Sequence, residues 1–170
     1  HPKETLIVVT ADHETGGIAL GTGKYALNLK ALENQKASAE VLSKKISDLR
    51  KAKNNHVAWE DIKNLLSEEM GFWSVLPITW EQEKKLRDEY EKSFVRNKVE
   101  FAESMYAKTE PMAAKAKEVM DQIAMVGWTS GGHSAGYVPV FAIGAGSDLF
   151  IGKMDNTEIP KRIAKAGGYK

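Results

Sequence analysis

Asp12 and His13 are neighbouring side chains that could bind a metal ion, and they directly follow an apolar run at residues 6–9. This short β-branched run is typical of a strand buried on both faces of a parallel or mixed sheet. Gly16 and Gly17 come next and would allow the backbone to turn tightly. A carboxylate oxygen and an imidazole nitrogen both suit Zn²⁺. Taken alone, the pair fits a capped, exposed turn without metal at least as well.

A second candidate ligand, His133, lies in a Gly/Ser-rich segment that leads into an apolar run at residues 138–143. It follows His13 by 120 positions, so only tertiary structure could bring the two imidazoles together. Ligands gather at the carboxyl ends of strands in open α/β sheets, and both segments could share such an edge. Ser130 and Ser134 flank His133 without a nearby base in the sequence, and we interpret them as turn residues.

The two segments together resemble the alkaline phosphatase family. Its pattern is a strand ending in Thr-Ala-Asp-His, followed much later by a Gly-His-Ser/Thr turn and a Val-Pro-Val-Phe/Tyr-Ala-x-Gly strand. The resemblance covers the beginning and the end of the chain but not its middle. The matching residues are Thr10, Ala11, Asp12, His13, Gly132, His133, Ser134, Val138, Pro139, Val140, Phe141, Ala142 and Gly144, with a similar tail at Leu149, Phe150, Gly152 and residues 155–159.

The resemblance implies a set of metal ligands. Alkaline phosphatases hydrolyse phosphate monoesters with a serine nucleophile between two Zn²⁺ ions and a nearby Mg²⁺. Asp12 and His13 match ligands of the zinc that holds the serine, and His133 matches a ligand of the other zinc. The serine, the remaining zinc ligands, the Mg²⁺ ligands and the phosphate-binding arginine would lie upstream of Thr5. We therefore assign no catalytic nucleophile to these residues.

The chain starts at His1-Pro2 without an initiator Met and looks like a piece of a larger protein. We expect the C-terminal part of a phosphate monoester hydrolase, inactive alone. Its partners would be the substrate and the remainder of the parent chain, and a homodimer is a further expectation. The family resemblance implies a periplasmic or secreted location.

Two other interpretations stay open. Metal-dependent phosphoglycerate mutases and phosphodiesterase-like enzymes of the wider superfamily also use a strand ending in Asp-His and a later His. The residues after the motif, Glu14-Thr15-Gly16-Gly17, look more like alkaline phosphatase. The third interpretation is a non-catalytic helical interaction module in which both histidines are structural.

Composition limits the partners. The 170 residues suffice for one domain's core, and their net charge of +1 gives no support to nucleic acid or a charged membrane surface. No run of 18 apolar residues predicts a membrane span. The sequence contains no cysteine, which excludes disulfides and thiolate zinc ligands.

The middle of the chain, about residues 34–126, shows apolar residues at helical spacing, and we expect a helical insertion within a single domain spanning residues 1–170. Helices are expected from about Asn34, from Trp59 to a cap at Gly71, and from a capping box at Thr79. The last of these could continue through Phe101 and Met105. His56 lies in a polar segment and receives no metal.

A fourth helix should begin near Pro111 and stop at Gly127, and a last one should run from Asn156 or Thr157 to Gly167. The expected fold class is α/β, with two or three strands of a larger sheet, a long helical insertion and a C-terminal helix. Such a piece should leave sheet edges or apolar faces uncovered. We expect three tryptophans, Trp59, Trp73 and Trp80, to pack the helices together, with a partner surface or lid as the alternative.

Overall fold

The computed structural model describes residues 1, 3–23, 25–103 and 108–169. The chain divides into two compact units. We call the first, His1–Gly17 together with Gly132–Lys170, the terminal unit, and the second, Ile18–Gly131, the helical unit. Both sequence motifs belong to the terminal unit, and the expected helices of the middle of the chain belong to the helical unit.

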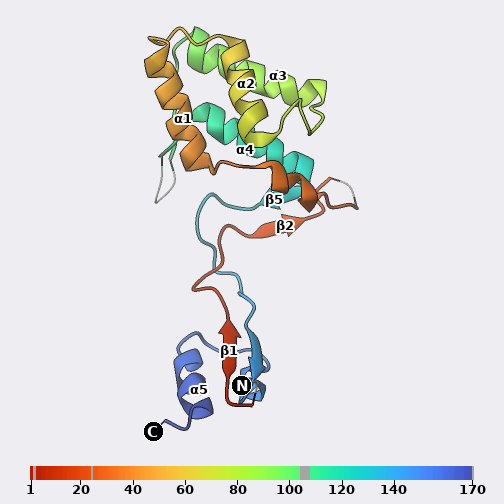
Figure 1. The fold of residues 1–170 in the computed structure, drawn as a ribbon, viewed down its shortest axis with the longest axis vertical. Coiled ribbons are helices and arrows are strands. Elements are labelled where there is room, and N and C mark those ends of the chain that lie inside the picture. The colour runs from red at the N-terminus through yellow and green to blue at the C-terminus, as the bar shows by residue number, and fades with distance from the viewer. Residues whose placement is uncertain (2, 24, 104–107, 170) are drawn as a thin grey trace. The chain divides into compact units, whose positions relative to one another are not determined.

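The terminal unit is built on two antiparallel strands, β1 (Leu6–Val9) and β6 (Phe141–Gly144). A 3₁₀ helix, η3 (Ser147–Phe150), and a helix, α5 (Glu158–Ala166), follow β6. Figure 1 shows α5 beside β1, and the Leu6 and Val8 side chains of β1 share a hollow with Ile163 of α5. The strand that pairs with β1 in this structure runs in the opposite direction, so the pair itself is antiparallel, as pairs within a mixed sheet can be.

The other face of this strand pair is exposed and apolar. Ile7 lies opposite Ile143 and Val9 opposite Phe141, and in an antiparallel pair such partners share one face. These four side chains are 53 to 69% exposed. The prediction that the run at residues 6–9 is a strand buried on both faces is thus wrong, because α5 covers only the opposite face. The prediction of an uncovered apolar face is confirmed.

The second strand begins later than expected, at Phe141 instead of Val138. Pro139 has no N–H group with which to pair, so the segment before Phe141 does not continue the ladder. The carbonyl oxygen of Pro139 instead accepts a hydrogen bond from Thr10 Oγ1 at 3.2 Å. This bond ties the segment after β1 to the segment before β6.

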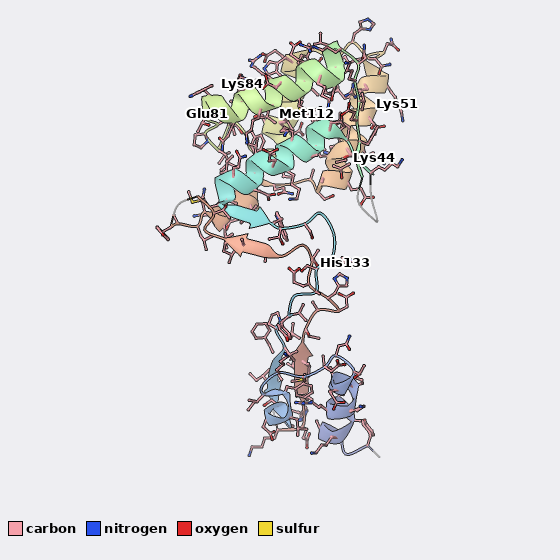
Figure 2. All side chains as sticks on the ribbon, turned by 180° about the vertical axis from the view of Figure 1, so that it is seen from behind. Lys44, Lys51, Glu81, Lys84, Met112 and His133 are labelled. Atoms are coloured by element: carbon pink, nitrogen blue, oxygen red, sulfur yellow. The ribbon has the colours of Figure 1, made fainter. Side chains whose placement is uncertain are left out.

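The helical unit consists of helices with two small antiparallel strand pairs. Helix α4 packs against α1 and α3, and Met112 of α4 is fully buried among them (Figure 2). The elements are β2 (Ile18–Leu20), η1 (Leu29–Asn34), α1 (Ala39–Ala52), α2 (Trp59–Met70), α3 (Trp80–Tyr90), a π turn η2 (Glu91–Val95), β3 (Ala102–Glu103), β4 (Lys108–Thr109), α4 (Pro111–Ala124) and β5 (Val126–Trp128), with β2 paired to β5 and β3 to β4.

Local sequence signals set several helix ends as predicted. Gly71 ends α2 in the left-handed conformation at φ 72°, which glycine adopts without strain. Thr79 and Gln82 form a reciprocal capping box at the start of α3. Pro111 is the first residue of α4, and Gly167 follows the last residue of α5. These helix ends are confirmed.

Other boundaries differ from the prediction. The segment at Asn34 closes a 3₁₀ helix, and α1 starts only after Ser38, whose side chain accepts a hydrogen bond from Val41 N. The third helix does not continue to Phe101, because the π turn ends it at Val95; Met105 lies outside the described residues. Helix α4 ends before Met125, which is left-handed at φ 58°, and Gly127 pairs in β5 instead.

Two of the three tryptophans pack the helices together. Trp59 is 9% exposed and meets the Tyr90 ring edge to face, with ring centres 5.6 Å apart. Trp73 packs against the same core and donates its indole N–H to Glu83, whose pKa is lowered chiefly by the hydrogen bond from Arg87. Trp80 is the first residue of α3 and is 72% exposed, so the prediction that it packs the helices together is wrong.

A buried ion pair lies within the helical unit. The Glu110 side chain is 1% exposed, and its carboxylate accepts a hydrogen bond from Arg50 Nη2 at 2.9 Å. The same carboxylate accepts hydrogen bonds from Met112 N and Ala113 N. These N–H groups lie in the first turn of α4, where backbone donors have no acceptor within the helix. The guanidinium of Arg50 also stacks over the Phe94 ring, 3.5 Å from its centre. Glu110 therefore joins the start of α4 to α1.

Candidate metal-binding site

The antiparallel pairing of β1 and β6 explains how residues far apart in sequence meet. The end of β1 lies beside the beginning of β6, since Val9 is opposite Phe141. The segment that leaves β1 carries Asp12 and His13, and the segment that enters β6 carries His133. An isolated bridge between Glu14 and Ser134 continues the pairing beyond the strands.

The two imidazoles lie against each other. The ring centres of His13 and His133 are 3.5 Å apart, with 28° between the ring planes. Figure 2 labels His133, which is exposed in its loop. Our prediction that the two motifs converge, despite a separation of 120 positions, is confirmed.

Asp12 completes this cluster. Its Oδ2 lies 3.3 Å from His13 Nε2, while its Oδ1 accepts a hydrogen bond from His13 N at 3.0 Å. The Asp12 side chain is 84% exposed and that of His13 is 37% exposed. A carboxylate oxygen and an imidazole nitrogen are therefore held side by side, and water or an ion can reach both.

The separation of one Asp12 oxygen and one His13 nitrogen matches that of two ligands on one zinc ion. Two ligands on one tetrahedral zinc, each bonded at about 2.0–2.1 Å, are about 3.3 Å apart. The distance between His13 Nε2 and Asp12 Oδ2 is 3.3 Å. His13 Nδ1 lies 3.0 Å from Glu14 O, and a hydrogen bond from Nδ1 to a backbone carbonyl is the usual way in which a metal-binding histidine is oriented.

The cluster is nevertheless short of ligands. Within the described ranges, no group of three or more His, Cys, Asp or Glu side chains is arranged so that it could hold a metal ion by itself. Asp12 and His13 would give one ion two contacts, and His133 would give a second ion one.

His56 belongs to the helical unit, is exposed, and lies with its Nδ1 2.9 Å from Asn54 O, as expected of a loop residue.

The structure adds two residues that the sequence did not single out for the site. The Glu14 carboxylate accepts a hydrogen bond from Gly17 N at 2.7 Å and a short one from Ser134 Oγ. Ser134 was expected only to form a turn. The contact joins residues 120 positions apart, and no local pattern in either segment could have indicated it.

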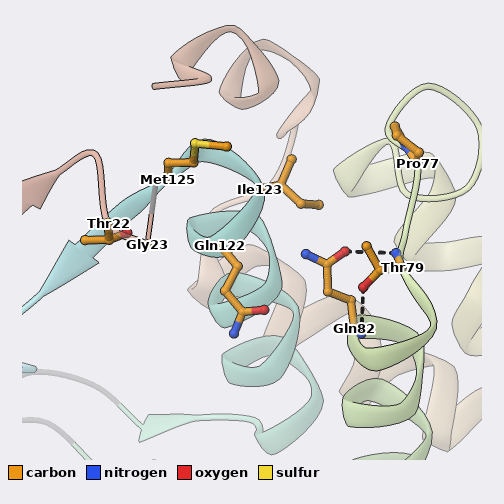
Figure 3. Close-up of a pocket in the computed structure, with 8 residues that line it drawn as sticks. All are labelled: Thr22, Gly23, Pro77, Thr79, Gln82, Gln122, Ile123 and Met125. Atoms are coloured by element: carbon orange, nitrogen blue, oxygen red, sulfur yellow. Dashed lines mark hydrogen bonds between the residues drawn. The ribbon is translucent and has the colours of Figure 1, made fainter. Parts of the chain in front are cut away.

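A hollow of about 580 Å³ lies in the helical unit (Figure 3). Its polar side chains include Thr79 and Gln82, which are hydrogen-bonded to each other's backbone groups in the capping box. None of the eight lining residues is ionisable, so the hollow offers no charge for a metal ion or a phosphate. They are Thr22, Gly23, Pro77, Thr79, Gln82, Gln122, Ile123 and Met125.

Comparison with known proteins identifies the family. A family model described as alkaline phosphatase matches residues 1–169. The chain belongs to the alkaline phosphatase family. Alkaline phosphatase 3 of Bacillus subtilis (strain 168) is 31% identical over an alignment of 178 residues, and the alignment covers 98% of this chain and 31% of the relative. Alkaline phosphatase 4 of the same organism is 26% identical, and the match covers 96% of this chain and 30% of the relative.

Solved structures agree. A cold-active alkaline phosphatase from the psychrophile Shewanella sp. matches 97% of this chain and 34% of its own length, with a TM-score of 0.64 and 25% identity. The Thermus thermophilus alkaline phosphatase matches with a TM-score of 0.59 at 22% identity, over 99% of this chain and 35% of its own, and shows the fold alone. The expected α/β class with a partial alkaline-phosphatase-like sheet is confirmed.

This member of the alkaline phosphatase family spans about a third of the length of the relatives it matches. Of the helices that the described residues form, none has the length and apolar character needed to cross a membrane.

Proposed function

We propose that this chain is the metal-ligand-bearing C-terminal part of a zinc-dependent phosphate monoester hydrolase. Asp12 and His13 would hold one Zn²⁺ ion and His133 would contribute to a second. The observation that carries the proposal is the cluster itself, with two stacked imidazoles and the Asp12 carboxylate 3.3 Å from one of them. These are the residues that match the family's metal ligands.

The roles of these residues follow from their chemistry. When bound, a pair of zinc ions lowers the pKa of an attacking oxygen and stabilises the leaving oxygen. Asp12 would supply negative charge, and His13 would supply a neutral nitrogen oriented by the carbonyl of Glu14. His133, stacked on His13, would present its nitrogen to the second ion. In this proposal the serine nucleophile, the other zinc ligands, the Mg²⁺ ligands and the phosphate-binding arginine come from an upstream part of the parent chain.

The exposed face of the β1–β6 pair supports such an upstream part. Ile7, Val9, Phe141 and Ile143 present an apolar face to solvent, and a two-stranded sheet is marginal in water. Further strands or helices of the parent chain would cover this face. We also propose, from the family, a homodimer and a periplasmic or secreted location for the parent enzyme.

We expect the 170-residue chain alone to have no measurable phosphomonoesterase activity, because in this proposal the serine nucleophile and the phosphate-binding arginine come from the upstream part of the parent chain. The measurement is hydrolysis of an aryl phosphate with Zn²⁺ and Mg²⁺ in excess. Two variants serve as controls, His13→Ala within the cluster and His56→Ala outside it. All three proteins should give the background rate. Turnover by the unaltered chain and by His56→Ala, but not by His13→Ala, would show that a nucleophile lies within these residues.

A further inference from the structure

Glu14 contacts both segments that carry the candidate metal ligands. Its carboxylate oxygen Oε2 accepts hydrogen bonds from Gly17 N, in its own turn, and from Ser134 Oγ, beside His133. Its backbone carbonyl lies 3.0 Å from His13 Nδ1 and 3.4 Å from Ser134 N. One residue therefore touches the ring of His13 and both the backbone and the side chain of the residue after His133.

The side chain of Glu14 is also held by packing. A Cβ atom built on Gly136 would lie 3.0 Å from Glu14 Cγ, so the loop that contains His133 passes close to the Glu14 stem. Glu14 and Ser134 are half-buried, whereas Asp12 and His133 are exposed. Ordering the exposed Asp12 and His133 side chains costs conformational entropy. The half-buried contact between Glu14 and Ser134 joins the two loops and offsets part of that cost.

We infer that Glu14 and Ser134 are positioning residues, a pair whose hydrogen bond sets His13 and His133 face to face. The pair does not touch a reacting atom. It acts on the two imidazoles by fixing the distance between their loops. The inference about stacking stands on the geometry of the terminal unit; its value for metal binding rests on the proposed function.

The chemistry of the pair predicts which substitutions preserve it. The hydrogen bonds from Gly17 N and from Ser134 Oγ end on the same oxygen, Glu14 Oε2. An amide oxygen has two lone pairs and can accept both bonds, so Glu14→Gln should keep the arrangement without the charge. Glu14→Ala removes the acceptor. Ser134→Ala removes the donor, and Ser134→Thr retains it.

The test is proton NMR of the full 170-residue chain without metal. In the unaltered chain, carbon-bound ring protons of His13 and His133 should give nuclear Overhauser cross-peaks, because the ring centres are 3.5 Å apart. These cross-peaks should disappear in Glu14→Ala and Ser134→Ala and persist in Glu14→Gln and Ser134→Thr. Unchanged signals from β1 and β6 would show that each variant remains folded; if Glu14→Ala does not fold, Ser134→Ala decides.

Two results would overturn the inference. One is a His13–His133 cross-peak that survives in a folded Ser134→Ala or Glu14→Ala variant. The other is its loss in Glu14→Gln as well as in Glu14→Ala, which would mean that the hydrogen bonds accepted by residue 14 do not by themselves hold the two rings together. Because no metal is added, failure of zinc to bind would count against the proposed function and leave this result unaffected.

Discussion

Replacing Glu110 by alanine should lower the free energy of unfolding of the helical unit by about 3–5 kcal/mol, the range measured when one partner of a buried ion pair is removed. The substitution leaves the Arg50 guanidinium, 13% exposed, without its carboxylate. It also removes the acceptor that caps Met112 N and Ala113 N at the start of α4. Both losses occur at a site that water cannot easily reach.

Urea unfolding followed by far-UV circular dichroism would measure this change. Asp88→Ala is the matched control, because it also removes one carboxylate from an ion pair, but its partner Lys84 lies on the surface and both side chains are more than half exposed. The control should cost less than about 1 kcal/mol. Equal losses of unfolding free energy in Glu110→Ala and Asp88→Ala would show that the buried Arg50–Glu110 pair contributes no more than the exposed Lys84–Asp88 pair.

Leu86→Ala should destabilise the helical unit by about 2–5 kcal/mol, because it leaves a cavity that the neighbouring side chains fill only in part. Leu86 of α3 is fully buried, and Tyr90 and Phe94 continue the same stripe into the core. Val41→Ala on α1 is the control, since Val41 is 46% exposed and its loss should be small. A near-neutral effect of Leu86→Ala would indicate that the stripe of Leu86, Tyr90 and Phe94 lies on the surface. It would then favour the interpretation that the helical unit presents a surface to a partner.

Features that depend on local chemistry could be predicted from the sequence. Gly71, Thr79 and Pro111 mark helix ends because the backbone conformation or hydrogen bonding at each position is set by that residue and its immediate neighbours. Met125 was missed, because a left-handed methionine after α4 has no such local signal. That residue adopts this conformation where the chain turns from α4 into the β2–β5 pair.

Features that depend on distant contacts could not be predicted in the same way. The run at Leu6–Val9 predicts a strand, but its burial depends on what covers each face, and here Ile7 and Val9 are exposed. Similarly, the convergence of His13 and His133 followed from the order of strands and loops together with the family resemblance. The Glu14–Ser134 contact followed from neither, because it joins two side chains 120 positions apart that carry no local signal for each other.

The central claim is that Asp12, His13 and His133 are zinc ligands. It is tested most directly by following the imidazole nitrogens of the 170-residue chain by ¹⁵N NMR during a Zn²⁺ titration. Site-resolved signals separate the cluster from His56 and from His1, whose ring lies beside the terminal amino group. Asp12→Ala is the matched variant, because it removes one oxygen ligand and leaves both imidazoles in place.

Zinc should shift the His13 and His133 nitrogens and leave His56 unchanged. Saturation should need high zinc concentrations, because two protein ligands on one ion are fewer than the three or four of a stable site. Asp12→Ala should weaken the response of His13 more than that of His133. No response at His13 and His133, or an equal response at His56, would contradict the claim and favour a helical interaction module in which both histidines are structural.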